Sequence, residues 1–151
     1  MLDQAQHRIY MYQLIKEIFD SPLRQYLAFK GGTLCYFLKW LPRFSTDLDF
    51  DLIQDSPDII PLLEKIVNKL GKVKDKHNKR FSYFILMDYG AHHHNIKIEI
   101  SKKKYINNTY EQVNFFWTPI RAMANDAIFT NKLLALHTRY KNRDLFDVHF
   151  F

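Results

Sequence analysis

The chain has 151 residues, a length that suits one compact domain over residues 1–151 rather than two. Hydrophobic residues make up 47% of it and aromatic residues 16%, which is enough for a substantial core and excludes disorder for the bulk of the chain. The formal net charge of +6 modestly favours a polyanionic partner such as RNA or a nucleotide.

The cysteine content and the hydropathy of the chain indicate where in the cell the protein is expected. The single cysteine, Cys35, rules out an internal disulfide and suits a reducing cytosol. The N-terminus lacks a basic start followed by an apolar run, and no stretch approaches the ~18 apolar residues of a membrane span. We therefore expect a cytoplasmic protein without a membrane partner.

The first third of the chain predicts two helices around a short strand. Apolar residues at helical spacing predict a helix over residues 3–19, and a strand-like run follows over 26–30. Thr33 is placed to cap a helix that continues through Trp40 and cannot pass Pro42.

The middle of the chain alternates again between strand and helix. Residues 48–52 place apolar and acidic side chains on opposite faces, which is typical of a half-buried strand. A helix is expected over 59–70, closed by Gly71. Strands are expected near 72–78 and 81–88, and over 96–100.

The pattern is less clear beyond this point. Residues 102–123 give no firm assignment except for a candidate strand over 110–117. A helix is expected over about 125–139, and a last helix begins near Asn142. The order of elements predicts an α+β or α/β domain with a small mixed sheet flanked by helices.

Two adjacent motifs carry the candidate chemistry. The pair Gly31-Gly32, between a strand and a helix, lets backbone N–H groups approach a phosphate, and Thr33 adds a hydroxyl donor. Asp47 and Asp49, two apart on a strand, project from one face and together suit one or two Mg²⁺ ions. Alone, the first motif is usually a turn and the second a solvated strand face; together they favour a phosphate-transfer site.

The segment from Lys30 to Phe50, with Lys-Gly-Gly-Thr followed by Arg-Phe-Ser-Thr-Asp-Leu-Asp-Phe, resembles the nucleotidyltransferase superfamily and in particular the AbiEii/MenT-type toxins. A second segment, residues 131–147, is similar to that family's Lys-x-x-Ala-Leu…Arg-Asp-x-x-Asp block. The resemblance implies a polymerase-β-like nucleotidyltransferase fold and a type IV toxin–antitoxin function.

The resemblance also implies roles for individual residues. It implies that Asp47 and Asp49 bind Mg²⁺ and act in catalysis, together with Lys132 and Asp144. The triphosphate of the NTP substrate would then be held by the glycine turn and its neighbours: Gly31, Gly32, Thr33 and Lys132. Lys132 would neutralise phosphate charge, which fits a reaction that develops negative charge on the α-phosphoryl group.

Each of these residues also has a simpler interpretation. Lys132 alone would be a surface helix residue, and Arg143 and Asp144 alone could form a local ion pair. Glu99 is either a third metal ligand from a neighbouring strand or an ordinary exposed residue that pairs with Lys97, and the two remain open.

Other charged segments are assigned to solvated surface. His92, His93 and His94 fit a polar loop better than a zinc site, because neighbours on an extended chain point alternately. Two basic stretches are usually solvated but would be the places for bound RNA: Lys102-Lys103-Lys104, and Lys72, Lys74, Lys76, Lys79 and Arg80.

The expected function is Mg²⁺-dependent transfer of a nucleotide from an NTP to an RNA acceptor, such as a tRNA 3′ end, restrained by an antitoxin protein. Two alternatives stay open: a small-molecule or protein hydroxyl as acceptor, and a catalytically silent nucleotide-binding module. Members of the family commonly continue into a further helical region, so the resemblance implies either a short member or the absence of a C-terminal part after Phe151.

Overall fold

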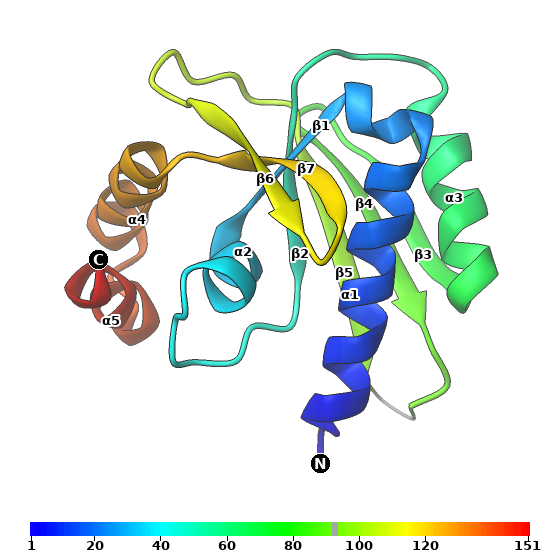
Figure 1. Ribbon diagram of the computed structural model, residues 1–151, viewed down its shortest axis with the longest axis horizontal. Helices are drawn as coiled ribbons and strands as arrows, with labels where there is room; N and C mark the ends of the chain where they lie inside the picture. The colour runs from blue at the N-terminus through cyan, green and yellow to red at the C-terminus, as the bar shows by residue number, and fades with distance from the viewer. Residues whose placement is uncertain (92–93) are drawn as a thin grey trace.

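The computed structural model describes residues 1–91 and 94–151. Five α-helices, one short 3₁₀ helix and seven strands follow one another along the described chain (Figure 1). In chain order they are α1 (Gln4–Asp20), η1 (Pro22–Gln25), β1 (Leu27–Lys30), α2 (Gly31–Leu38), β2 (Leu48–Leu52), α3 (Ile59–Leu70), β3 (Lys72–Asn78), β4 (Ser82–Asp88), β5 (Asn95–Ser101), β6 (Tyr110–Phe115), β7 (Thr118–Met123), α4 (Asn125–Arg139) and α5 (Asn142–Phe150).

The strands form one mixed sheet in the order β3-β4-β5-β2-β1-β7-β6. Strand β2 is central: it runs parallel to β5 and antiparallel to β1. Strand β1 is in turn parallel to β7, whereas the β3–β4, β4–β5 and β6–β7 pairs are antiparallel. The mixed sheet that the sequence predicts is therefore confirmed.

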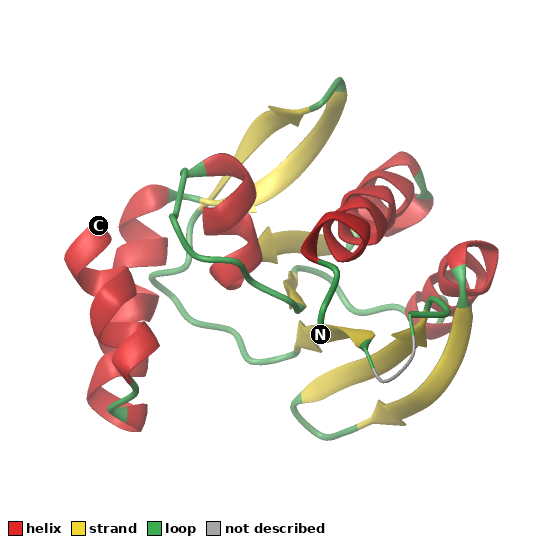
Figure 2. Ribbon diagram, turned by 90° about the horizontal axis from the view of Figure 1, so that it is seen from below, coloured by secondary structure: helices red, strands yellow, loops and turns green. Residues whose placement is uncertain are grey.

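Helices α1 and α3 lie together on one side of the sheet, and α4 and α5 lie on the other (Figure 2). Alternation in β2 turns Leu48, Phe50 and Leu52 toward α1, where the Phe50 ring lies 6.1 Å from that of Phe19. Isoleucines of β5 extend the same buried layer. Burial of these apolar side chains, each worth ~2 kcal/mol, fixes the register of the strands. The acidic residues of β2 consequently face α4.

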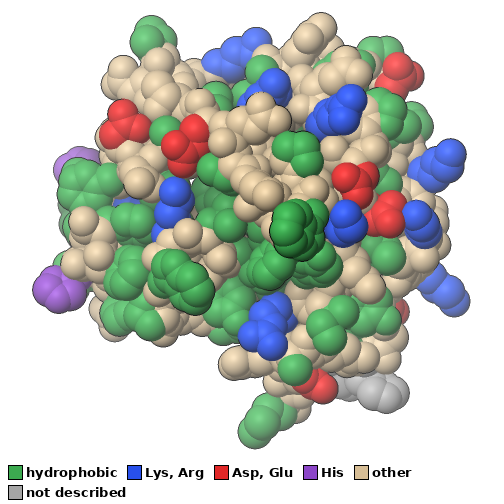
Figure 3. Space-filling view, in the orientation of Figure 1, with side chains coloured by type: hydrophobic (Ala, Val, Ile, Leu, Met, Phe, Trp, Pro, Cys, Tyr) green, Lys and Arg blue, Asp and Glu red, His purple; other side chains and the backbone are tan. Residues whose placement is uncertain are grey.

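The α4–α5 hairpin buries little of its own surface. Within the described chain only Ala127, Ile128, Asp144 and Asp147 are buried in these two helices. Several large apolar side chains remain exposed there, and hydrophobic groups gather over this side of the molecule in Figure 3; they are Phe129, Leu133, Leu134, Leu145, Phe146 and Phe150. Leu133 and Tyr140 are thus surface residues although they are large and apolar.

Most predicted elements are confirmed, but the start of one helix is wrong and one strand was not predicted. Helix α2 begins at Gly31 instead of after a cap at Thr33, because Lys30 is the capping residue. The candidate strand over 110–117 is confirmed as β6, and β7, which pairs with it in a hairpin, was not foreseen. Of the three histidines assigned to a polar loop, His92 and His93 lie outside the described residues. Across residues 1–91 and 94–151, none of the helices combines the length and hydropathy needed to cross a membrane.

Candidate active site

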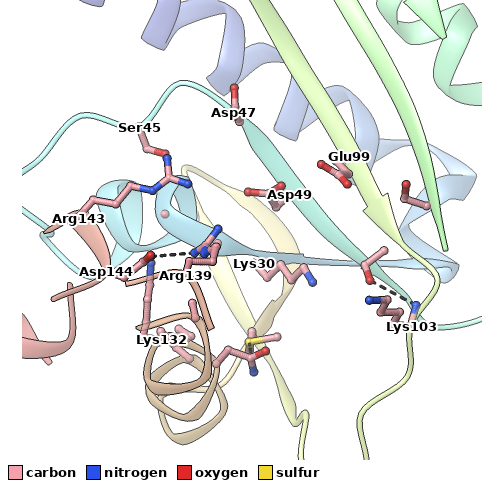
Figure 4. A pocket seen from close by; sticks show the side chains of 18 of the residues that line it. Lys30, Ser45, Asp47, Asp49, Glu99, Lys103, Lys132, Arg139, Arg143 and Asp144 are labelled. Carbon is pink, nitrogen blue, oxygen red and sulfur yellow. Dashed lines mark hydrogen bonds and ion pairs between the residues drawn. The ribbon is translucent and has the colours of Figure 1, made fainter. Parts of the chain in front are cut away.

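A cavity of about 570 Å³ lies between the acidic face of the sheet and helix α4. Asp47, Asp49 and Glu99 line it from the side of β2 and β5, while α4 and α5 supply basic groups and Asp144 on the opposite wall, as Figure 4 shows. The basic lining residues outnumber the acidic ones: Lys30, Arg43, Lys97, Lys103, Lys132, Arg139 and Arg143 against Asp47, Asp49, Glu99 and Asp144. A volume of this size is typical of small-molecule and cofactor sites.

The glycine turn lies at one side of this cavity. Gly31 has a φ of +85°, and a Cβ placed there would lie 2.7 Å from Oδ2 of Asp49. A Cβ on Gly32 would lie 3.0 Å from the Ser45 hydroxyl oxygen. The first turn of α2 also has no side-chain cap, since the side chain of Lys30 makes no capping hydrogen bond. Backbone N–H groups of the turn are therefore open to an anionic ligand.

Thr33 does not supply the hydroxyl donor that the sequence predicts. Its side chain is fully buried, and its Oγ1 donates to the main-chain carbonyl of Asp47. Thr33 is also absent from the residues that line the cavity. The hydroxyl is already used to hold the start of β2 against α2, so its role is to position Asp47.

Asp47, Asp49 and Glu99 lie on one face of the sheet. Asp49 and Glu99 are direct partners in the parallel β2–β5 pair, and Asp47 precedes Asp49 by two residues. All three line the cavity, and in Figure 4 the side chains of Asp49 and Glu99 lie near each other, whereas that of Asp47 extends away from them. The sequence thus places all three predicted metal ligands on a single wall.

Lys97 is the cation that balances this acidic face. Its Nζ lies 3.4 Å from Asp47 Oδ2 and 3.4 Å from Glu99 Oε2. The pairing with Glu99 that the sequence suggested is confirmed, and Asp47 shares the same ammonium group. Burial raises the pKa of Asp49 to about 6, and the negative charges of Asp47 and Glu99 add to that effect while Lys97 and Lys30 oppose it.

The donor set fits Mg²⁺. Among the described residues no three His, Cys, Asp or Glu side chains form a ready-made metal cluster. Mg²⁺ does not require one, because it is commonly held by one or two carboxylates together with waters and substrate phosphates. Asp49 is half-buried and lies beside two other carboxylates. A divalent cation bound there would offset the repulsion between these negative charges. Asp47 and Asp49 would hold such an ion, and Glu99 is within the same face.

Asp51, the second acidic residue of β2, has a structural role. It is buried, lies 2.6 Å from the Nζ of Lys30, and accepts hydrogen bonds from Tyr110 at 2.7 Å and Asn108 at 3.1 Å. These partners tie β2 to β1 and β6. Asp51 is also absent from the residues that line the cavity, so its role is to join these strands.

Lys132 belongs to a buried ionic cluster rather than to an exposed helix surface. Its Nζ lies 2.5 Å from Oδ2 of Asp147, a residue with no exposed surface. Arg43 donates to the same carboxylate, from Nε at 2.6 Å and from Nη2 at 2.5 Å. Burial alone would raise the pKa of Asp147, but the hydrogen bonds from Arg43 and Lys132 outweigh it and hold that pKa below its usual range.

The ion pair of Asp144 differs from the one expected. Its Oδ1 accepts from Nη2 of Arg139 at 2.8 Å, not from the adjacent Arg143. Its Oδ2 is buried without a hydrogen-bond partner among the described residues, and Asp144 lines the cavity. Arg143 lines the same wall (Figure 4). The free carboxylate oxygen can therefore accept a hydrogen bond from a ligand hydroxyl or amine.

Sequence reasoning missed Arg43, Asp147, Arg139 and Arg143 as parts of the site. Arg43 and Asp147 are 104 residues apart, so only the fold could reveal their pairing. Arg139, Arg143 and Asp147 all lie within the second motif block, and Arg43 opens the run that ends in Asp47 and Asp49. Because all four residues lie inside the two motif blocks, this position could have indicated that they belong to the site.

One known family matches nearly the whole chain. The family described as AbiEii nucleotidyl transferase toxin, type IV toxin–antitoxin system, matches residues 13–151. No curated protein sequence matches the chain significantly.

Solved structures give similar folds. JHP933 from Helicobacter pylori is 26% identical, with a TM-score of 0.70 over 99% of this chain and 66% of its own length. A second H. pylori structure, also 26% identical, has a TM-score of 0.73 over 99% of this chain and 68% of its own.

A third similar structure is MenT4, a nucleotidyltransferase toxin from Mycobacterium tuberculosis. It is 17% identical, with a TM-score of 0.68 over 96% of this chain and 57% of its own length, and it supports the fold alone. The chain therefore spans about two thirds of the H. pylori proteins and just over half of MenT4. Since the family match covers nearly the whole sequence, this chain belongs to the AbiEii family of nucleotidyltransferase toxins of type IV toxin–antitoxin systems.

Proposed function

We propose that this protein transfers a nucleotide from an NTP to an RNA acceptor, with a tRNA 3′ end as the acceptor to test first, in a reaction that depends on Mg²⁺. The observation that carries the proposal is the closeness of the glycine turn to the acidic face: a Cβ on Gly31 would lie only 2.7 Å from Asp49 Oδ2. A phosphate bound at the turn would lie beside Asp49, which is the juxtaposition that nucleotidyl transfer needs.

The donor triphosphate is assigned to the side of the cavity between the glycine turn and α4. The uncapped first turn of α2 offers backbone N–H groups there. Lys132, Arg139 and Arg143 supply positive charge from the opposite wall. Lys132 is held in place by Asp147, so its ammonium group is already positioned when the nucleotide arrives.

In the proposed reaction an acceptor hydroxyl oxygen forms a bond to the α-phosphorus of the NTP. The bond from that phosphorus to the bridging oxygen breaks, pyrophosphate leaves, and the hydroxyl proton passes to solvent. Mg²⁺, when bound by Asp47 and Asp49, would supply charge neutralisation for the phosphates. Positioned cations such as Lys132 favour the charge that develops on the α-phosphoryl oxygens.

A partner antitoxin is part of the proposal. It is supported by membership of a toxin family and by the exposed apolar side chains of α4 and α5, but neither feature identifies the partner. Co-expression with a neighbouring gene that restores the growth of cells producing this protein is the test.

The activity itself is tested by incubating the protein with each α-³²P-labelled NTP, MgCl₂ and total tRNA. The expected result is label in tRNA with at least one NTP and no label when EDTA replaces MgCl₂. Label confined to protein or to an added small-molecule alcohol would overturn the RNA acceptor and favour the alternative acceptors. No label in any acceptor, under conditions in which a known nucleotidyltransferase toxin labels tRNA, would contradict transferase activity.

A further inference from the structure

An aromatic and basic surface borders the cavity on the side away from α4. It consists of Arg80 and Phe81, from the turn between β3 and β4, and Lys103 and Tyr105, which follow β5; we call it the strand-end platform. Phe81, Lys103 and Tyr105 line the same cavity as Asp49 and Glu99. In Figure 4, Lys103 lies beyond the carboxylates, opposite Lys132, Arg139 and Asp144.

The platform is held together by the backbone, which leaves its side chains free for a ligand. The amide of Lys102 donates to the carbonyl of Phe81 at 2.9 Å, which joins the two segments. The side chain of Lys102 is used inside the fold: its Nζ donates to Asn78 Oδ1 at 2.6 Å and to the carbonyl of Lys79 at 2.7 Å. Lys102 is therefore a structural member of its basic run, whereas Lys103 faces the cavity.

Phe81 and Tyr105 are large aromatic residues that lie on the surface instead of in the core. The side chain of Phe81 is 53% exposed, and that of Tyr105 is 46% exposed. Two cations lie over the Phe81 ring, with Arg80 Cζ at 5.0 Å from the ring centroid and Lys103 Nζ at 5.3 Å. Within the described part of the chain neither cation has an ion-pair partner. An exposed ring flanked by unneutralised cations is the combination that binds single-stranded nucleic acid.

The position of the platform separates acceptor from donor. In-line displacement at phosphorus requires the attacking hydroxyl and the departing pyrophosphate on opposite sides of the reacting group. The glycine turn, Lys132 and Arg143 form the phosphate-binding side of the cavity, so the acceptor must approach from the other side. The platform occupies that other side, beyond Asp49 and Glu99.

We propose that the strand-end platform binds the 3′-terminal nucleotides of a single-stranded RNA acceptor, with a base stacked on Phe81 or Tyr105 and backbone phosphates paired with Arg80 and Lys103. This inference rests on the proposed transfer to RNA and adds which residues hold the acceptor. Recognition by stacking and charge tolerates any base sequence, because every base has a stacking face and every nucleotide a phosphate.

The test measures RNA and nucleotide binding separately. A 5′-fluorescein-labelled single-stranded RNA of ~12 nucleotides is titrated with the parent protein and the variants, and its fluorescence anisotropy is followed. Phe81→Ala is expected to weaken RNA binding about tenfold, because it removes one stacked base. Arg80→Gln/Lys103→Gln is expected to weaken it and to lower the slope of log K against log salt by about 1.4, or about 0.7 for each lost phosphate contact.

The matched control is Arg24→Gln/Lys65→Gln, which removes the same charge from two exposed residues outside the cavity. It is expected to bind RNA nearly as the parent does. Binding of Mg-ATP by calorimetry should be unchanged in Phe81→Ala and in Arg80→Gln/Lys103→Gln. Since Phe81, Arg80 and Lys103 are exposed, their thermal unfolding midpoints should match that of the parent.

The outcomes distinguish this inference from the function on which it rests. If the parent extends RNA but the platform variants bind RNA as tightly as the parent does, the acceptor lies elsewhere and the platform assignment is wrong. If Phe81→Ala weakens the binding of Mg-ATP but not the binding of RNA, the Phe81 ring holds the base of the donor nucleotide and the inference is also overturned. If the parent neither binds nor extends RNA, while nucleotide transfer to another acceptor persists, both the platform assignment and the RNA acceptor fail.

Discussion

At the scale of single residues, side chains of the same type have different roles because their neighbours in the fold differ. Asp47, Asp49 and Asp51 alternate along one segment, of which β2 contains the last two, yet Asp51 is fully buried and paired with Lys30 whereas Asp49 is half-buried beside two other carboxylates. A sequence shows three equivalent acids. The neighbours that distinguish them come from β1, β5 and β6, and no local pattern encodes those neighbours.

Cys35 is expected to be unreactive. Burial raises the pKa of its thiol to about 11, although the nearby charge of Lys132 opposes this. At pH 8 the thiolate fraction should be about 100-fold lower than that of an exposed cysteine, and buried contacts slow access further. Iodoacetamide should therefore modify the folded protein far more slowly than the urea-unfolded protein, as measured by intact mass. Equal rates in the two states would contradict the burial of this residue.

Asp147→Asn is expected to destabilise the protein strongly. The change leaves Arg43 and Lys132 without their buried counter-charge, so the free energy of unfolding should fall by about 3 kcal/mol in urea titrations at pH 7. The folded-state pKa of Asp147 is lowered, so its ionised carboxylate stabilises the fold above the ordinary carboxyl pKa. This stabilisation is lost as the pH falls through the folded-state pKa. The difference in the free energy of unfolding between the parent and Asp147→Asn should thus become smaller below about pH 4.

The control for this change is Asp20→Asn, which breaks an ion pair with Lys16 at the surface. It should cost less than about 1 kcal/mol, as exposed pairs do. Equal losses for Asp147→Asn and Asp20→Asn would show that the buried cluster contributes no more than a surface pair.

At the scale of elements, strong periodicity made β2, α3 and β5 predictable. Their apolar residues recur at the strand or helix period and are buried as expected. The β6–β7 hairpin was missed because its turn lacks the usual signal. Phe116 and Trp117 have φ values of 44° and 73°, a left-handed conformation that normally calls for Asn or Gly.

The start of α2 was misplaced for a related reason. Gly31 and Gly32 look like a break before a helix, but they form its first turn. The sequence cannot show that Asp49 fills the space where a Cβ would lie, and this contact explains why the first position is glycine. The candidate site was therefore predictable in its acidic residues and its turn, and not in the packing between them.

Gly31→Ala tests that contact, with Gly90→Ala as its matched control. Both glycines have a φ of +85°, so each substitution should add a similar backbone strain of about 1 kcal/mol. A Cβ on Gly90 meets no atom within 4 Å, whereas a Cβ on Gly31 lies 2.7 Å from Asp49 Oδ2. Nucleotide transfer should be lost in Gly31→Ala alone, and its thermal midpoint should fall by more than that of Gly90→Ala, because the added Cβ also displaces Asp49. Parental activity in Gly31→Ala would place Asp49 outside the reaction.

At the scale of the whole molecule, the cavity joins two parts of unequal stability. The sheet and its covering helices α1 and α3 contain most of the buried apolar side chains, whereas α4 and α5 bury few. Regions with few buried apolar contacts open at lower free energy. The basic wall of the site therefore lies on the less stable part, attached to the rest by the Asp147 cluster.

Hydrogen–deuterium exchange should reveal this difference. Amides of α4 and α5 are expected to exchange faster than those of β1, β2 and β5 in the parent protein. Asp147→Asn should accelerate exchange in α4 and α5 further and leave the three strands nearly unchanged. Uniform protection across all five elements would contradict a separable C-terminal hairpin.

The most direct test of the account is nucleotide transfer by Asp49→Asn, compared with Asp58→Asn, which alters an exposed aspartate outside the cavity. Each variant is incubated with labelled NTP, MgCl₂ and tRNA after its fold has been verified by circular dichroism. We predict that Asp49→Asn folds normally and loses at least about 100-fold in rate, because a metal-ligand charge is removed with little change in volume. Asp58→Asn should match the parent. Transfer at the parental rate by a folded Asp49→Asn protein would contradict the assignment of the acidic face as the catalytic site.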